Sequence, residues 1–198
     1  MKKYLILITI VGFLFVLYIL ISPYFKYGGL FDVNYTYDDM KENYYKNRRQ
    51  ITELQKYFLN IVPNNKSVLF EFNKRVDRFN FVIREKDNGH FNFISGYNMK
   101  LHSYEFNNLI KKIGWTNKHL DTLLLKLKKA NCISIFKQEY DNKPITIGFR
   151  RVGYFLPGYS SYLLFNQNVP DSVINEWSNK EGCVKYNDSV IFKTNFPL

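Results

Sequence analysis

The sequence predicts an α+β fold, in which one N-terminal transmembrane helix precedes a single domain with a largely antiparallel sheet and three to four helices. The first observation is a continuous apolar run at residues 4–22. The second is the order of the later segments, which is helix, strands, two helices and strands, without the regular β-α-β alternation of a parallel sheet. The third is composition: 46% of the 198 residues are hydrophobic and 18% aromatic, which indicates a folded chain with a real core.

The apolar run at residues 4–22 contains no charged side chain and no proline. At about 1.5 Å per residue, a helix of this length spans roughly 28 Å, close to the thickness of a bilayer's hydrocarbon core. A cleaved signal peptide would have a shorter apolar region and small residues at its cleavage site, and a core helix would have a polar side. Both stay open as alternatives, but the length and flanks favour an uncleaved anchor in the lipid bilayer.

Basic residues on either side of the run predict its orientation. Lys2 and Lys3 precede it, whereas Lys26 is the only basic residue between it and Lys41. The positive-inside rule therefore places the N-terminus in the cytoplasm. We expect an anchor at residues 1–22, a juxtamembrane linker at 23–37 and an extracytoplasmic domain at 38–198. Richness in Ile, Lys, Asn, Tyr and Phe is typical of an A+T-rich bacterial genome, which suggests a bacterial inner membrane.

A long helix is predicted from about Asp38 to Val62, because apolar residues recur there at steps of three and four. Acidic residues occupy its first turns, where the helix dipole favours them, and Pro63 ends it. The helix could form a dimeric coiled coil. However, its apolar seam lasts barely three heptads and is interrupted by Asn47, so packing on the domain's own sheet is the favoured use.

Two groups of strands surround a pair of helices. The first group, a predicted meander, comprises residues 67–72, 78–85 and 90–94. The second comprises residues 132–137, 145–152, 159–165, 183–186 and 190–193, with a short helix at 171–178. The helix pair lies between them: Ser103 can cap the first helix, Gly114 ends it, and Thr116 can cap the second.

This helix pair and the strands after it are also consistent with a winged helix that meets phosphate through lysines on its second helix. Amphipathic helix pairs are common, and the expected topology keeps the domain away from cytoplasmic DNA. We therefore expect no nucleic-acid partner. A membrane-tethered DNA-binding regulator stays as the second alternative, and it requires the reversed topology.

The chain contains two cysteines, Cys132 and Cys183, and no CxxC motif. In an oxidising compartment they could form one disulfide, whose loop of about 50 residues would contribute roughly 4 kcal/mol in the chain-entropy model. Two buried free thiols are the competing interpretation, because spacing alone cannot show that the geometry is suitable.

Catalytic and cofactor motifs have little support in the sequence. The segment at residues 158–162 resembles G-x-S-x-G but has tyrosine in place of the second glycine. His90, His102 and His119 do not have the spacing of a metal site, and no phosphate-binding glycine loop occurs. We expect no metal and no cofactor. Acids from separate strands could still meet as a glycosidase pair; the candidates are Asp77, Glu85, Asp87 and Glu139.

Net charge and arginine placement point to an anionic partner. The formal net charge is +11, and Lys2 and Lys3 account for two of these charges. A basic domain beside a membrane can interact with anionic headgroups or acidic glycans, although a basic surface can also serve solubility alone. Arginines near tyrosines suit an anionic ligand or a protein partner, with ordinary surface stacking as the alternative. The candidate patch comprises Arg75, Arg78, Arg150, Arg151, Tyr154 and Tyr159.

These observations predict a membrane-tethered, extracytoplasmic interaction domain that binds a protein or anionic envelope partner without catalysis. The first alternative is an envelope hydrolase that acts on glycan or lipid. Its carboxylates would have to lie about 5–10 Å apart in a pocket. The oligomeric state is left open by the sequence.

Overall fold

The computed structural model describes residues 13, 18, 36–73, 78–87, 90–138, 143–152, 158–166 and 169–194. Of the predicted anchor, only Phe13 and Tyr18 are among them, and both are helical. The rest of the anchor and nearly all of the predicted linker lie outside the described residues. Over the described ranges, the structure contains no helix with the length and apolar character needed to cross a membrane. A compact unit of residues 35–151 and 159–198 contains the hydrophobic core.

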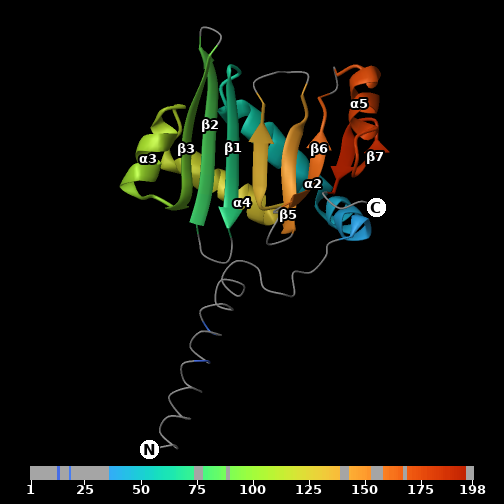
Figure 1. The fold of residues 1–198 in the computed structure, drawn as a ribbon, viewed down its shortest axis with the longest axis horizontal. Coiled ribbons are helices and arrows are strands. Elements are labelled where there is room, and N and C mark those ends of the chain that lie inside the picture. The colour runs from blue at the N-terminus through green and yellow to red at the C-terminus, as the bar shows by residue number, and fades with distance from the viewer. Residues whose placement is uncertain are drawn as a thin grey trace, which may run out of the picture. The chain divides into compact units, whose positions relative to one another are not determined.

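Eight strands form one sheet in the order β3-β2-β1-β4-β5-β6-β8-β7 (Figure 1). The described registers, between β1 and β2, β1 and β4, β2 and β3, β4 and β5, β6 and β8, and β7 and β8, are all antiparallel. The strands are β1 (Lys66–Asn73), β2 (Arg78–Asp87), β3 (His90–Lys100), β4 (Ser134–Lys137), β5 (Ile145–Val152), β6 (Gly158–Leu164), β7 (Cys183–Asn187) and β8 (Val190–Lys193).

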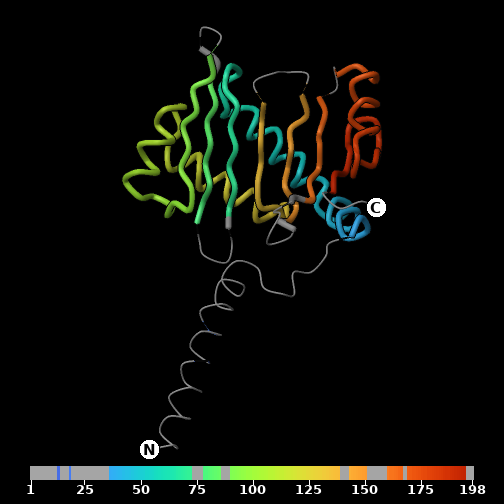
Figure 2. Tube along the Cα trace, viewed as in Figure 1, coloured from blue at the N-terminus to red at the C-terminus, as the bar shows by residue number. Residues whose placement is uncertain are grey.

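Four helices occur in the described part of the chain: α2 (Tyr37–Ile61), α3 (Tyr104–Lys111), α4 (Asn117–Lys129) and α5 (Asp171–Ser178). Figures 1 and 2 show α2 and α4 crossing behind the strands, with α3 next to β3. Helix α5 packs near β7, at the other end of the sheet. The large antiparallel sheet and the helices confirm the α+β class.

Helix α2 begins where its sequence provides a complete N-terminal cap. The Asp39 backbone N–H donates to the Thr36 hydroxyl, and the Asp39 carboxylate accepts from the Thr36 backbone N–H at 2.7 Å. This reciprocal pair satisfies two amides that the first helical turn leaves without partners. The helix is kinked at Asn47, whose φ of −115° and ψ of 17° are not helical. The polar residue that interrupts the apolar pattern is therefore the site of the bend.

The pair α3 and α4 forms as predicted. The Phe106 backbone N–H donates to the Ser103 hydroxyl at 3.3 Å, so Ser103 caps α3. After α3 the chain turns through Gly114, whose φ of 74° suits a residue without a Cβ. His119 Nδ1 accepts from the Thr116 backbone N–H at 3.1 Å at the start of α4. His119 thus has a helix-capping role.

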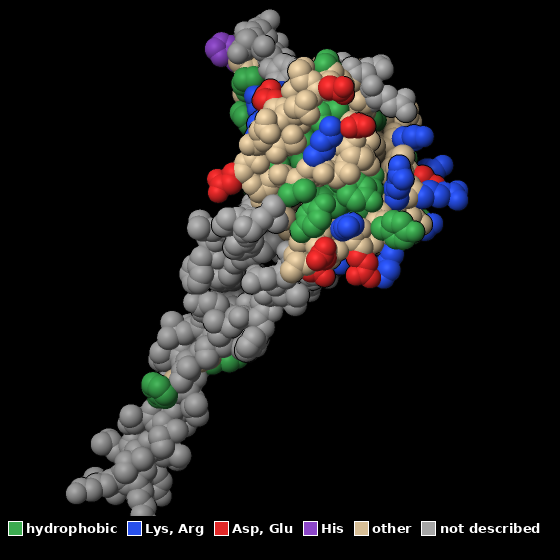
Figure 3. All heavy atoms as spheres, turned by 90° about the vertical axis from the view of Figure 1, so that its right-hand side faces the viewer, with side chains coloured by type: hydrophobic (Ala, Val, Ile, Leu, Met, Phe, Trp, Pro, Cys, Tyr) green, Lys and Arg blue, Asp and Glu red, His purple; other side chains and the backbone are tan. Residues whose placement is uncertain are grey.

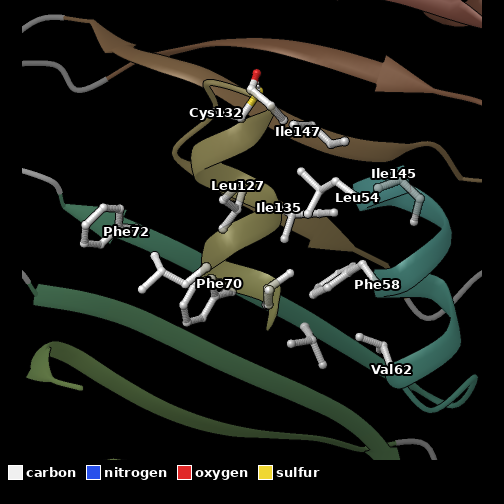
Figure 4. Packing of buried hydrophobic residues seen from close by; sticks show 14 of the residues in the cluster. Leu54, Phe58, Val62, Phe70, Phe72, Leu127, Cys132, Ile135, Ile145 and Ile147 are labelled. Atoms are coloured by element: carbon white, nitrogen blue, oxygen red, sulfur yellow. Dashed lines mark hydrogen bonds between the residues drawn. The ribbon is translucent and has the colours of Figure 1, made fainter. Parts of the chain in front are cut away.

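The main hydrophobic core lies between the helical layer and one face of the sheet. Leu54 and Phe58 of α2 and Leu127 of α4 point toward Phe70 of β1 and Ile135 of β4 (Figure 4). A second cluster forms on the opposite face, because successive strand side chains alternate between faces. It joins strand residues to α5 and comprises Leu163, Phe165, Val169, Ile174 and Ile191.

The predicted meander and the later strands belong to one sheet, because β1 pairs with β4 through Leu69 and Phe136. Strand β3 continues beyond the predicted end at residue 94 to Lys100. Its pairing with β2 shifts register between Phe79 and Phe81, which is the bulge that lets the longer strand stay paired. Helix α2 packs on the sheet of its own chain, in agreement with the favoured interpretation.

Candidate functional site

The outward side of α2 carries long polar side chains, because most of its apolar residues face the core. Lys46, Arg49 and Lys56 are exposed there. A shallow recess of about 690 Å³ runs along this side; its lining residues are Tyr45, Lys46, Arg48, Arg49, Gln50, Thr52, Glu53 and Lys56. All eight belong to α2, so the recess is an open helix surface that can be reached from solvent.

Helix α4 lies beside α2 and runs antiparallel to it. Near the end of α2, the Tyr57 hydroxyl donates to the His119 carbonyl at 3.2 Å. Closer to the start of α2, the Asn43 amide approaches the Ala130 carbonyl at 3.5 Å. The two helices therefore lie side by side, and we call their outward surface, within residues 45–56 and 118–129, the α2–α4 face.

The α2–α4 face is strongly basic. It contains eight lysines and arginines and two acidic residues, Glu53 and Asp121, which gives a formal charge of +6. Both acids pair with neighbours: Arg49 Nε lies 2.9 Å from Glu53, and His102 Nε2 lies 3.2 Å from Asp121. Figure 3, turned so that the right-hand side of Figure 1 faces the viewer, shows lysine and arginine side chains gathered at its right edge, where the helical layer lies.

The electrostatics of Glu53 follow from these basic neighbours. Its hydrogen bond from Arg49, together with the charges of Lys126 and Lys129, lowers the pKa of the Glu53 carboxyl. Lys126 Nζ lies 3.9 Å from the same carboxylate and 5.6 Å from the centre of the Tyr57 ring. Glu53 thus stays ionised and holds Arg49 and Lys126 in place. The other basic residues of the face still outnumber it.

Two large side chains on these helices are exposed among the charges. Tyr45 is 79% exposed and lines the recess, and Leu125 of α4 is 52% exposed. The other leucines of α4 between residues 120 and 127 are buried. The surface can therefore offer apolar contacts as well as positive charge to whatever approaches it.

A buried polar network fixes α2 against the sheet beneath this face. The Tyr162 hydroxyl donates to the Met40 carbonyl at 3.0 Å and accepts from the Asn43 amide at 3.0 Å. The Asn131 side chain, which follows α4 at a residue with a positive φ of 52°, donates to the side-chain oxygen Oδ1 of Asn43 at 2.9 Å. Burial raises the pKa of the Tyr162 phenol, so this hydroxyl stays protonated and able to donate.

The structure assigns Arg150 of the predicted patch to this network. Its guanidinium donates to the Asn131 side chain at 2.8 Å and to the Asn131 carbonyl at 3.0 Å, and it lies 4.7 Å from the centre of the Phe149 ring. Arg150 therefore supports the end of α4. Arg78 lies at the start of β2, separated from β5 by β1 and β4.

The other members of the predicted patch cannot be placed with these two arginines. Arg75 and Tyr154 lie outside the described residues. Arg151 and Tyr159 are described only as backbone in β5 and β6. The described side chains of the patch thus do not assemble into one site, and the α2–α4 face has a much denser concentration of charge.

Both cysteines are free thiols in the structure. Cys132 is buried in the main core, whereas Cys183 packs against the second cluster on the opposite face of the sheet. Burial raises the pKa of the Cys183 thiol, which makes it less reactive. The disulfide interpretation gains no support, because the two side chains join different hydrophobic clusters.

Groups with potential metal or acid–base chemistry are dispersed. Within the described ranges, no three His, Cys, Asp or Glu side chains cluster as metal ligands would. Glu85 accepts from Lys66 at 3.1 Å, across β1 and β2. Asp77 and Glu139, and the side chain of Asp87, lie outside the described part of the chain. The glycosidase pair considered from the sequence stays a hypothesis.

No family model, curated protein or solved structure matches this chain. The chemistry of its own surfaces is therefore what indicates a function.

The sequence contained a signal for the α2–α4 face, although the predicted patch was placed at arginines in other parts of the chain. Lysines lie off the apolar stripe of the second predicted helix, and Arg48 and Arg49 lie off the stripe of the first. The missing information was the pairing of the two helices. Periodicity shows which side of each helix is polar, but not that two polar sides become neighbours.

Proposed function

We propose that this chain is a membrane-tethered interaction domain, held to a bacterial inner membrane by residues 4–22 and facing the extracytoplasmic side. The observation that carries the proposal is the α2–α4 face, an exposed surface with a formal charge of +6. A surface of this kind attracts anionic partners over a distance set by the ionic strength. The proposed role is to bind an anionic or protein partner in the envelope, without catalysis.

Packing supports this use of the helices. The apolar sides of α2 and α4 pack into the core, whereas their charged sides form ion pairs with neighbouring side chains, as at Arg49 and Glu53. Exposed ion pairs such as Arg49 with Glu53 contribute little to stability, about 0–1 kcal/mol each. The stability of the fold therefore does not account for the concentration of charge on these helices, whereas binding of an anionic partner would.

The topology is tested by protease protection. Protease is added to intact spheroplasts, and fragments are followed with antibodies against the domain and against a cytoplasmic marker. We expect the domain to be digested while the marker survives. A domain that is cut only after lysis would contradict the proposal and would favour the membrane-tethered DNA-binding alternative, because the lysines would then face the cytoplasm.

The partner is tested by crosslinking in intact cells, followed by purification of the full chain. We expect crosslinks at amines of the α2–α4 face, such as Lys46 and Lys129. Crosslinks confined to the edge strand β3, for example at Lys100, would move the partner surface away from the helices and contradict this assignment.

A further inference from the structure

We infer that the α2–α4 face binds the anionic phospholipid headgroups of the membrane that holds the chain. The inference rests on the proposed function, because it takes the tether as given and names what the basic surface contacts. It gives the domain a fixed resting orientation, with the helices toward the bilayer and the sheet away from it.

The layout of the charges fits a lipid surface. Exposed basic residues occur along both helices, Lys46, Arg49 and Lys56 on α2 and Lys118 and Lys129 on α4. A bilayer presents headgroups over an extended plane, so many separate contacts with lysine and arginine can form at once. Long side chains suit this use, since their flexible stems adapt to mobile headgroups.

Apolar side chains among the charges strengthen the inference. Interfacial helices combine basic residues with aromatic or leucine side chains that reach the boundary between headgroups and acyl chains. Tyr45 and Leu125 are the large exposed side chains on α2 and α4, and each has a basic residue four positions later on the same side of its helix, Arg49 and Lys129. The α2–α4 face therefore has both chemical components of such an interface.

The distribution of acids defines which part of α2 approaches the lipid. Asp38, Asp39 and Glu42 lie in the first turns of α2, before the basic segment at residues 46–56 begins. Headgroup phosphates repel this acidic end. We therefore expect contact to begin after the first turns of the helix. Lys46, whose ammonium also pairs with the Glu42 carboxylate, is the first basic residue of this contact.

The tether makes a weak contact sufficient. Residues 23–35 separate the predicted anchor from Thr36, and a chain of this length spans at most about 50 Å when fully extended. The domain is thus confined near one bilayer surface, at an effective concentration that free proteins do not reach. Modest electrostatic attraction can then keep the face in contact with the membrane for most of the time.

The test uses the full chain in lipid nanodiscs made of phosphatidylcholine alone, or with one third phosphatidylglycerol. A water-soluble amine reagent is applied briefly, and the modification of each lysine is read by mass spectrometry. We expect Lys46, Lys56 and Lys129 to react about fivefold more slowly in the anionic discs. Lys100 and Lys185, on β3 and β7, should react equally in both. High salt should remove the difference, because it shortens the screening length from about 8 Å to about 3 Å.

Two matched variants distinguish an effect of the α2–α4 face from an effect of the protein's total charge. The first carries Lys46→Gln, Arg49→Gln and Lys56→Gln, which keep good helix formers in α2. The second, the control, also loses three charges: it carries Lys100→Gln, Lys180→Gln and Lys185→Gln. Each basic residue near an anionic surface contributes about a fivefold factor, so the first variant should weaken docking about a hundredfold and expose Lys129. The control should keep Lys129 protected.

Three results would overturn the inference. Equal reactivity of Lys129 in both kinds of disc, with the chain still embedded, excludes lipid contact while leaving the tether intact. Protection of Lys129 by duplex DNA or by a crosslinked protein, but not by phosphatidylglycerol, assigns the face to another class of partner. A chain that fails to incorporate into either disc contradicts the proposed function itself and removes the basis of the lipid contact.

Discussion

At the residue scale, one buried phenol joins three parts of the fold. The Tyr162 hydroxyl, on β6, bonds to the Met40 carbonyl and the Asn43 amide of α2, and Asn43 in turn bonds to Asn131 after α4. Asn43 is buried near the start of α2, where a polar side chain is costly unless it has partners. The network therefore explains why asparagines interrupt the apolar stripe of α2.

Replacing Tyr162 with Phe should destabilise the domain by about 1–3 kcal/mol, because it leaves two buried polar groups of α2 without that partner. The measurement is the urea midpoint of unfolding. Tyr45→Phe is the matched control, since that side chain is 79% exposed on the same helix, and it should leave the midpoint unchanged. Equal midpoints for the two variants would show that the network contributes nothing.

The same phenol predicts a pH dependence. Burial raises the pKa of Tyr162 above its usual value of 10.0 in the folded domain, whereas in the unfolded chain it titrates near that value. Its contribution to stability is therefore complete below about pH 10 and is lost as the pH rises further. Tyr162→Phe should show a shallower loss of stability above pH 10 than the wild-type chain. Parallel stability curves for the two proteins would contradict the assignment.

Two glycines with nearly the same backbone conformation provide a further prediction. Gly114 has a φ of 74° with nothing near the place of a Cβ, whereas at Gly182, φ 71°, a Cβ would overlap the backbone oxygen of Thr194. Gly114→Ala should cost about 1 kcal/mol for its left-handed backbone. Gly182→Ala should cost about 2–4 kcal/mol, because steric overlap adds to that strain. Similar thermal midpoints for both variants would show that the overlap with Thr194 adds no cost at residue 182.

At the element scale, local chemistry predicted the helices and most strands closely. The steps of three and four between apolar residues predicted α2, and Ser103, Gly114 and Thr116 predicted the boundaries of α3 and α4. Sheet pairing could not be predicted in this way. Val68 of β1 pairs with Lys137 of β4, and such long-range partners leave no local pattern in either strand.

Lys137 shows how that pairing completes a helix elsewhere in the chain. Helix α2 has no basic residue in its last turn, yet Lys137 Nζ lies 3.1 Å from the Pro63 carbonyl and 3.5 Å from the Asn64 carbonyl. A positive charge beside the C-terminal end of a helix is favourable. The side chain is buried, and these carbonyls solvate its ammonium group.

Lys137→Met keeps the length of the side chain but removes its charge and donors. We expect a loss of about 1–3 kcal/mol, because carbonyls near the end of α2 lose a charged partner. Lys185→Met, at an exposed position of β7, is the control and should change stability little. The readout is again the urea midpoint, and a stabilised Lys137→Met protein would show that desolvation of the ammonium outweighs its bonds.

At the scale of the whole molecule, the fold class was predictable but the candidate surface was not. The arginines were the basis of the predicted patch because guanidinium groups recognise anions well. In the structure Arg150 bonds to Asn131, and Arg78 lies on β2, which two strands separate from β5. The dense charge instead arises where α2 and α4 meet, which depends on tertiary packing. A site built by helix pairing is therefore read from sequence only after the pairing is known.

The separation between tether and domain leads to a final prediction. Every described residue of the main core lies between Met40 and Phe192, and the first helix of this unit is capped by Thr36. A chain beginning at Thr36 should therefore unfold cooperatively in urea and show near-ultraviolet circular dichroism of fixed aromatic side chains. It should also remain in the soluble fraction at alkaline pH, whereas the full chain stays with the membrane. Dye binding typical of a molten state would mean that the first 35 residues take part in folding, and release of the full chain by alkali would remove the tether that the anionic face needs.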